Sequence, residues 1–192
     1  MNKQITYPYV IKILQHYIEQ DDKVLEIGCG AKQYRDFLPK SEYFGLDLPQ
    51  SSYVSEEPEY PCSAENMPID DNVFNCIFGV ATFYLHMDPD KTFRECHRVL
   101  KPGGRLIAFD YKPNLLRRIK TDERYGHVQT WTPTEFSQRL ISAGFKAASV
   151  ENISRMVDFY DYPGWGRFTV RALKRALGQE TSNWMIIYAE KE

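Results

Sequence analysis

Strand-like and helix-like segments alternate along most of this chain, and this alternation restricts the fold more than any other feature of the sequence. Short apolar runs of strand length are separated by stretches whose apolar residues recur at helical spacing. The run VFNCIFGVA at 73–81 is almost continuously apolar, which is typical of a strand covered on both faces. This order predicts an α/β fold: parallel strands in a doubly wound sheet with helices on both faces.

Local signals bound the expected elements. The expected strands cover residues 24–27, 43–48, 73–81, 105–111, 146–153 and 183–192. The expected helices cover residues 8–19, 32–38, 89–100 and 132–144. Asp88 can cap the third helix, and Thr132 with Glu135 forms a capping box at the fourth. Residues 49–61 are rich in Pro, Ser and Glu and predict a loop, and the KPGG segment at 101–104 predicts a tight turn.

Length and composition predict one domain without a membrane span. The 192 residues, 43% of them hydrophobic, can bury one sizeable core. No early stretch joins a basic start to an apolar run, and no apolar run approaches the roughly 18 residues of a membrane span, so we expect a cytoplasmic protein. The four cysteines show no C-x-x-C spacing, which favours reduced, packed thiols over disulfides or a metal site.

Charge is unevenly distributed along the chain. Residues 1–110 carry 11 Lys/Arg against 17 Asp/Glu, whereas residues 111–192 carry 13 against 9. The overall net charge is only −2. This balance is far from the strongly basic profile of a general nucleic-acid binder, and we expect no specific nucleic-acid partner.

The segment VLEIGCGAKQY at 24–34 joins a strand-like run to a turn that contains Gly28 and Gly30. A dinucleotide fingerprint would place a third glycine where this chain has Gln33, and the Gly-Lys-Ser/Thr of a P-loop is absent. A pyrophosphate is therefore not the expected ligand. Glu26 lies two residues before the first glycine, and a carboxylate at a strand end suits a ligand with a positive charge, such as an amino group.

Four ordered motifs resemble those of the class I S-adenosylmethionine-dependent methyltransferases, particularly the small single-domain group. They are VLEIGCG (24–30), GLDL (45–48), SAENMPIDDNVFNCIF (63–78) and HRVLKPGGRLIAFD (97–110). The final strand also fits the antiparallel seventh strand of that family. The resemblance implies a seven-stranded Rossmann-like sheet in three layers, mostly parallel with an antiparallel last strand. It further implies S-adenosyl-L-methionine as cofactor and S-adenosyl-L-homocysteine as its product.

The resemblance also implies roles for residues that follow the first two strands. Gly28 and Gly30 would let the backbone approach the methionine and ribose parts of the cofactor, and Glu26 would help to orient the amino end. Asp47 would accept hydrogen bonds from both ribose hydroxyls, and Leu48 would pack on the adenine.

Two later segments would complete the cofactor site in this resemblance. They are Ala64 and Glu65 at the adenine edge, and the main chain at Val80 and Ala81 beside the methionine. Two positions depart from the family pattern. Lys32 replaces a frequent third small residue, and Ser63 stands where many relatives have an acid that binds the adenine amino group.

A general base is needed only if the methyl acceptor is a protonated hydroxyl or amine. His86 is the first candidate, because it follows the strand whose end faces the methionine and because imidazole titrates near neutrality. The other candidates are Tyr84, Asp110, Tyr111 and His127. Asp88 followed by Pro89 is better explained as a helix start than as part of a metal cluster, so we expect no metal.

Two stretches, at about 111–131 and 154–181, exceed what the cofactor fold needs and are expected to shape the acceptor site. Residues 112–124 carry a net charge of +3 and residues 167–178 a net charge of +4. These charges fit either a solvated helix face without a ligand or arginines at the pocket mouth that bind a small-molecule acceptor with carboxylate or phosphate. The stretch YRDFLPKSEYFGLDL resembles methyltransferases found with glycan enzymes. The alternatives are a catalytically silent methyltransferase-like module and a nicotinamide enzyme, and oligomeric state has no signal in the sequence.

Overall fold

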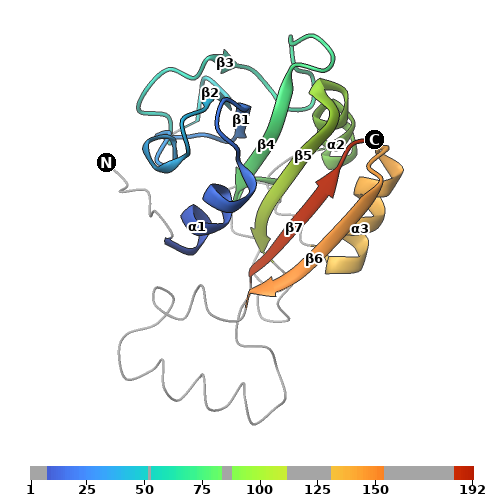
Figure 1. Ribbon diagram of the computed structural model, residues 1–192. Coiled ribbons are helices and arrows are strands. Elements are labelled where there is room, and N and C mark those ends of the chain that lie inside the picture. The colour runs from blue at the N-terminus through green and yellow to red at the C-terminus, as the bar shows by residue number, and fades with distance from the viewer. Residues whose placement is uncertain (1–7, 52, 84–87, 112–130, 154–183) are drawn as a thin grey trace, which may run out of the picture.

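The computed structural model describes residues 8–51, 53–83, 88–111, 131–153 and 184–192. These residues form a seven-stranded sheet in the order β3-β2-β1-β4-β5-β7-β6 (Figure 1). The strands are β1 (Lys23–Ile27), β2 (Glu42–Asp47), β3 (Tyr60–Pro61), β4 (Phe74–Val80), β5 (Leu100–Tyr111), β6 (Ala147–Ile153) and β7 (Trp184–Glu190).

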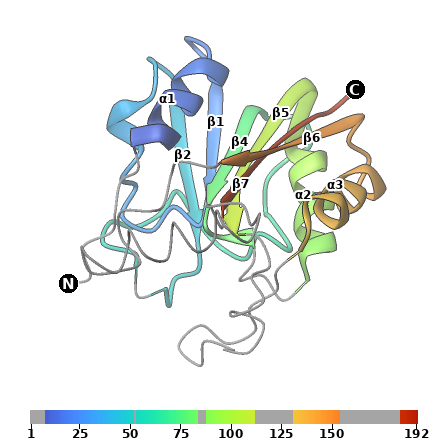
Figure 2. The ribbon, with the colours of Figure 1, turned by 90° about the horizontal axis from the view of Figure 1, so that it is seen from below.

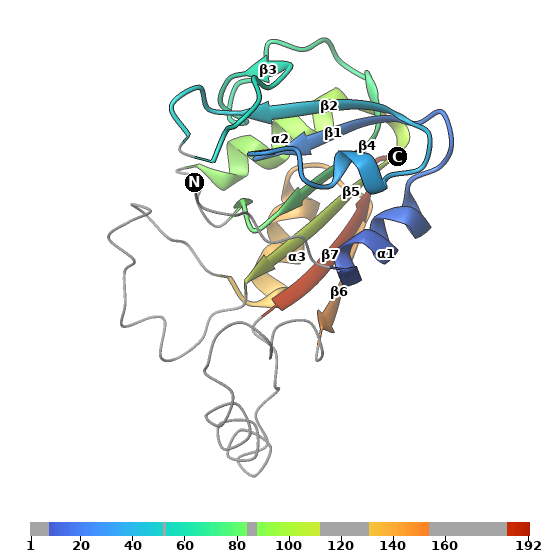
Figure 3. The same cartoon turned by 90° about the vertical axis from the view of Figure 1, so that its left-hand side faces the viewer.

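The first five strands are parallel to one another, whereas β7 is antiparallel to both β5 and β6. In Figure 3 the arrowheads of β1, β2 and β5 point to one side and that of β7 points to the other. The strand order reverses beside β1, so the carboxyl ends of β1, β2 and β4 lie next to one another. The predicted doubly wound sheet with an antiparallel last strand is confirmed.

Helices cover both faces of the sheet, which makes three layers. Figure 2 shows α1 (Pro8–Tyr17) on one side and α2 (Pro89–Val99) with α3 (Pro133–Ser142) on the other. The helix predicted at 32–38 is a shorter 3-10 helix, η1 (Arg35–Phe37). These layers place the loops that follow β1, β2 and β4 along one edge of the sheet.

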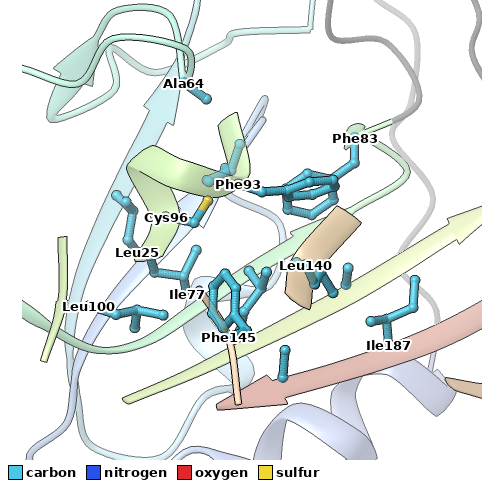
Figure 4. Packing of buried hydrophobic residues seen from close by; sticks show 14 of the residues in the cluster. Leu25, Ala64, Ile77, Phe83, Phe93, Cys96, Leu100, Leu140, Phe145 and Ile187 are labelled. Atoms are coloured by element: carbon cyan, nitrogen blue, oxygen red, sulfur yellow. The ribbon is translucent and has the colours of Figure 1, made fainter. Parts of the chain in front are cut away.

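Each face of the sheet carries its own apolar cluster. The cluster under α2 and α3 includes Leu25, Ile77, Phe93, Leu140 and Phe145 (Figure 4). The cluster under α1 includes Val10, Leu14, Val24, Phe78 and Trp184. Successive residues of β1 therefore face opposite clusters, and this burial on both faces explains the apolar runs that identified the strands.

The predicted helix caps are confirmed. The Asp88 carboxylate accepts a hydrogen bond from the Lys91 backbone N–H at 3.1 Å and caps α2. At α3, the Thr132 hydroxyl accepts from the Glu135 N–H at 3.2 Å, and the Glu135 carboxylate accepts from the Thr132 N–H at 2.7 Å. Gly144 follows α3 with a φ of +107°, a conformation that favours glycine.

Two local predictions were wrong. Residues 49–61, expected to be only a loop, include β3 at their end, where Tyr60 pairs with Leu46. The KPGG segment is part of β5 and not a tight turn. The pairing between β4 and β5 shifts register here, from Phe74 opposite Leu100 to Cys76 opposite Arg105, so the sheet absorbs the extra residues as a bulge.

The remaining expectations concern the cysteines, a metal site, a membrane span and the two inserts. All four cysteines are free thiols. Among the described residues, no group of His, Cys, Asp and Glu could hold a metal ion, and no helix is both long and apolar enough to cross a membrane. The two predicted inserts lie almost entirely outside the described residues, and the single-domain organisation with acceptor inserts stays a prediction.

Candidate functional site

The candidate site lies where β1, β2 and β4 end side by side. Ile27, the last residue of β1, is opposite Leu46 on one neighbour and Gly79 on the other. The glycine turn, Asp47 and the segment after Val80 therefore meet at the carboxyl edge of the sheet. Ligands of doubly wound sheets bind at such an edge, next to the point where the strand order reverses.

The glycine turn is held tightly against β2. The N–H groups of Gly28 and Cys29 both donate to the Leu46 carbonyl, at 2.8 and 3.1 Å. Gly28 has a φ of +69°, and a Cβ atom added to it would lie 2.3 Å from the Thr82 Oγ1. Conformation and close packing thus both require glycine here. Gly30, with a φ of +51°, follows in the same turn.

The Asp47 carboxylate is oriented by two backbone donors. Its Oδ2 accepts from the Gly30 N–H at 2.8 Å, and its Oδ1 accepts from the Leu48 N–H at 2.8 Å. Each oxygen still has a lone pair for a further donor. Leu48 follows as one of the most exposed large apolar side chains among the described residues, with 43% of its surface accessible. The arrangement fits a ribose and an adjacent flat apolar ring.

Glu26 is buried, with 2% of its surface exposed, and its carboxylate accepts a hydrogen bond from the Tyr43 hydroxyl. Burial raises the pKa of Glu26 to about 8, and the charge of Asp47 acts in the same direction. The Tyr43 hydrogen bond and the charge of Lys32 oppose this rise in pKa. A carboxyl with such a pKa can bind an ammonium group strongly once it ionises, because little water screens the attraction.

The adenine-edge segment after β3 is fixed to the start of α2. Ala64 is buried in the apolar cluster under α2 and α3, at 3% exposure. The Glu65 Oε1 accepts from the Asp88 backbone N–H at 3.0 Å, so this carboxylate helps to cap α2. Ser63, one of the two departures, accepts from the Glu65 N–H at 3.2 Å through its hydroxyl. Adenine contact by this segment stays a prediction.

The predicted lip beside the methionine lies after β4. Val80 is half-buried, and Ala81 has a φ of +55°, in the left-handed region. The Ala81 N–H donates to the Phe109 carbonyl at 2.7 Å, which ties the lip to β5. The pairing of Ile27 with Gly79 brings this segment next to the glycine turn, and its contact with the methionine stays a prediction.

Most of the residues predicted to act in catalysis are not described by the structure. His86, Tyr84 and His127 lie outside the described residues. Asp110 lies near the end of β5 and is buried, with 1% of its surface exposed. No catalytic role follows from these positions alone.

Two side chains of the site, those of Tyr43 and Lys32, were given no function in the sequence analysis. Tyr43 binds Glu26 from β2, and Lys32 is buried and contacts the acidic residues before β3. Strand alternation could have placed Tyr43 on the Glu26 face if the β1–β2 register had been known. A separate cleft of about 300 Å³ lies between α2 and α3, with Trp131 and Arg139 in its wall. None of the predicted cofactor residues lines that cleft.

Comparison with known protein families and curated sequences gives a consistent result. Residues 25–108 match the family described as methyltransferase domain. The phthiotriol/phenolphthiotriol dimycocerosates methyltransferase of Mycobacterium leprae is 24% identical over 178 residues, which cover 85% of this chain and 64% of that protein. The demethylmenaquinone methyltransferase of Thermotoga maritima is 30% identical over 138 residues, 66% of this chain and 58% of that protein. The chain therefore spans somewhat less than two thirds of the length of these relatives.

Solved structures share the fold at low sequence identity. A chain from the complex of the Haloferax volcanii Trm112 methyltransferase activator with a methyltransferase has a TM-score of 0.75 and 20% identity, covering 95% of this chain and 86% of that chain. Phosphoethanolamine N-methyltransferase 2 of Haemonchus contortus, solved with S-adenosyl-L-methionine, has a TM-score of 0.66 and 16% identity, covering 99% and 54%. The [4+2]-cyclase SpnF has a TM-score of 0.67 and 18% identity, covering 95% and 80%.

Proposed function

We propose that the protein transfers a methyl group from S-adenosyl-L-methionine to a small-molecule acceptor, because residues 25–108 match the family described as methyltransferase domain. The product of the cofactor is S-adenosyl-L-homocysteine. The observation that carries the proposal is the placement of Glu26, Asp47 and the glycine turn at neighbouring strand ends. This edge offers an acid for an ammonium group, an acid for two hydroxyls and a turn that lets the backbone approach the ligand.

Asp47 suits the ribose because its orientation is set before the ligand arrives. The Gly30 N–H holds one carboxylate oxygen at 2.8 Å, and both oxygens retain acceptor capacity toward the ligand. Hydrogen bonds from hydroxyls to a carboxylate are stronger than bonds between neutral groups. Leu48, exposed beside Asp47, would lose water contact under the adenine and stabilise the complex further.

Glu26 suits the amino group of the methionine moiety. It enters the site from β1, and the Tyr43 hydroxyl holds its carboxylate from β2. An ammonium group bound here would keep the carboxyl ionised and compensate the cost of its burial. The proposed pair therefore orients the methionine chain, with the lip at Val80 and Ala81 beside it.

Methyl transfer from a sulfonium is an in-line displacement in which a neutral thioether leaves. The main task of the protein is to hold the nucleophile, methyl carbon and sulfur collinear, and such positioning supplies about 7 to 11 kcal/mol. We retain His86 as the proposed base where the acceptor carries a proton. Replacing His86 with Ala is expected to lower turnover by about a hundredfold while cofactor affinity stays nearly unchanged. Turnover within a fewfold of the parent would remove His86 from the mechanism.

We propose an acceptor with carboxylate or phosphate, related to a glycan, from the sequence of the two inserts. Their net charges of +3 and +4 support an anionic acceptor, because arginine pairs well with both groups. The test replaces Arg117, Arg118, Arg171 and Arg175 in pairs and measures the acceptor KM at low and high salt. A neutral acceptor, or a KM independent of salt in every variant, contradicts this assignment.

The alternative is a module that binds the cofactor without transferring its methyl group. The specific observation that favours it is the [4+2]-cyclase SpnF, which shares this fold at a TM-score of 0.67. A shared fold does not fix the reaction. The alternative predicts binding of the cofactor and no methylated product with any acceptor.

Two measurements test the proposed function. Calorimetry with S-adenosyl-L-homocysteine and with NAD should detect the first ligand and not the second. Incubation of metabolite pools with S-adenosyl-L-methionine labelled in its methyl group should then yield a labelled product. Binding without transfer supports the alternative, and preference for NAD refutes both assignments.

A further inference from the structure

Lys32, which departs from the family pattern, has a buried ammonium group next to the candidate site. Its backbone has a φ of +51°, and only 1% of its side chain is exposed. The Nζ atom lies 2.7 Å from the Glu59 Oε1, 2.8 Å from the Glu57 carbonyl and 3.4 Å from the Glu56 Oε1. An ammonium has three N–H donors, and three acceptors surround this one. The side chain thus attaches the glycine turn to the segment before β3.

These contacts close a ring that contains the proposed ribose acid. Lys32 donates to Glu59, and the other oxygen of Glu59 accepts from the Gly45 N–H at 2.6 Å. Gly45 lies two residues before Asp47 in β2. Asp47 in turn accepts from the Gly30 N–H at 2.8 Å, and Gly30 lies two residues before Lys32. The ring therefore joins three segments: the glycine turn, the end of β2 that carries Asp47, and the acidic segment before β3.

The ring is tightly packed where β2 passes the glycine turn. A Cβ atom added at Gly45 would lie 2.7 Å from the Cys29 Sγ and 3.3 Å from the Glu59 Oε2. Little space therefore remains for the Glu59 carboxylate to move while it is bonded to both Lys32 and Gly45. Rigid support of this kind preorganises a binding residue.

The charges within the ring compensate one another. Burial acts to lower the pKa of Lys32, but its hydrogen bonds and ion pairs with Glu59 and Glu56 outweigh burial and raise that pKa. Burial likewise acts to raise the pKa of Glu59, and the hydrogen bonds from Lys32 and Gly45 outweigh it and lower that pKa. Both groups therefore stay charged at neutral pH, which is the state in which the ring is strongest.

We propose that Lys32 is a positioning residue for the nucleoside half of the cofactor, acting through Glu59 to hold the end of β2, and with it Asp47, against the glycine turn. The inference rests on the proposed function, because it assigns the ribose to Asp47. Arg35 forms an ordinary surface ion pair and provides the comparison for Lys32. It contacts Glu56 at 2.8 Å in the same acidic segment, but its side chain is 40% exposed and it does not reach Glu59.

The experiment is a double-mutant cycle with Lys32→Met, Glu59→Gln and the double variant, and with Arg35→Met as the matched control. The dissociation constant of S-adenosyl-L-homocysteine is measured by calorimetry, and urea unfolding with circular dichroism establishes that each variant is folded. Lys32→Met is expected to weaken binding about tenfold or more, as for a lost hydrogen bond to a charged group. The double variant is expected to bind no more weakly than Lys32→Met, because the ring is already open. Arg35→Met is expected to bind within about twofold of the parent.

The outcomes separate three cases. A parent protein that does not bind S-adenosyl-L-homocysteine refutes the proposed function and the inference together. A parent that binds, with a folded Lys32→Met of equal affinity, refutes the inference alone, even if that variant has lost stability. Additive losses for Lys32 and Glu59 also refute it, because they would act independently. If Lys32→Met does not fold, the comparison of Glu59→Gln with Arg35→Met decides, since only the first opens the ring.

Discussion

Cofactor binding should release a proton from Glu26 at neutral pH. This carboxyl is 2% exposed, and burial raises its pKa to about 8. At pH 7 the free protein therefore holds Glu26 mainly in the protonated form. An ammonium group bound beside it requires the ionised form, so that binding and deprotonation become coupled. The perturbation to apply is a change of pH between 6 and 8.5, with Glu26→Gln as the control.

The size of the effect follows from the ionised fraction. With a pKa of about 8, that fraction is about 0.1 at pH 7 and about 0.01 at pH 6. The apparent dissociation constant is the intrinsic one divided by the competent fraction. Affinity for S-adenosyl-L-homocysteine should therefore rise by about tenfold from pH 6 to pH 7 and level off above pH 8. About 0.9 proton should be released for each ligand bound at pH 7.

Calorimetry measures both quantities. Titrations at a series of pH values give the affinity, and titrations at pH 7 in two buffers of different ionisation enthalpy give the number of protons released. Glu26→Gln keeps the shape of the side chain but cannot ionise. The proton release measured with this variant therefore comes from the ligand's own amino group, and it is subtracted from the proton release of the parent. Cys29, whose pKa burial raises to about 12, does not titrate in this range. Equal pH dependence in the parent and in Glu26→Gln would refute the reasoning.

The same proton affects stability, with a defined sign. The folded-state pKa of Glu26 lies above its ordinary value of 4.5, so the folded protein retains a proton that the unfolded chain has lost. The resulting stability is fully present below pH 4.5 and is lost as the pH rises through about 8. Over this window the free energy of unfolding should fall by about 1.4 kcal/mol per pH unit relative to Glu26→Gln. Urea unfolding of both proteins at pH 5.5 and 7.5 measures this difference, and parallel curves would contradict it.

Two further predictions concern the ribose acid and the glycine turn. Asp47→Ala should weaken binding of S-adenosyl-L-homocysteine by about 1.5 to 3 kcal/mol, measured by calorimetry on a variant that is shown to be folded, and unchanged affinity would remove the ribose role. Gly28→Ala should lower the free energy of unfolding by about 1 to 3 kcal/mol in urea, because it combines a φ of +69° with a contact of 2.3 Å to Thr82. Gly103→Ala, with a φ of +73° and no atom within 4 Å of the added Cβ, is the matched control, and an equal loss there would exclude the contact as a cause.

The sequence predicted those parts of the fold that depend on local chemistry. The strands at the centre of the sheet are buried on both faces and so carry continuous apolar runs, as in β4. Asp88 and the Thr132–Glu135 box cap their helices through neighbouring backbone groups. β3 was missed because two residues at the sheet edge leave no such pattern. The register shift in β5 was missed because a Gly-Gly pair fits both a turn and a bulge.

The candidate site was predicted to the extent that topology alone defines it. Parallel strands that end side by side bring Glu26, Asp47 and the glycine turn to one edge, and motif order was sufficient for that. The partner of Glu26 was not predicted, because Tyr43 reaches it only in the register that sets Val24 opposite Tyr43. A one-residue change of register would turn the tyrosine to the other face. The identity of side-chain partners across strands is therefore a property of the packed sheet.

The burial of Lys32 and its ion pairs could not be predicted from the sequence either. Lysines are almost never fully buried unless they are paired, so an isolated lysine after a glycine turn is expected at the surface. Its partners lie 24 to 27 residues further along the chain, in a segment that reads only as an acidic loop. The sequence does contain three acidic residues close together, Glu56, Glu57 and Glu59. Such a cluster near a strand end would repel itself without a nearby cation, and the buried ammonium of Lys32 satisfies that requirement.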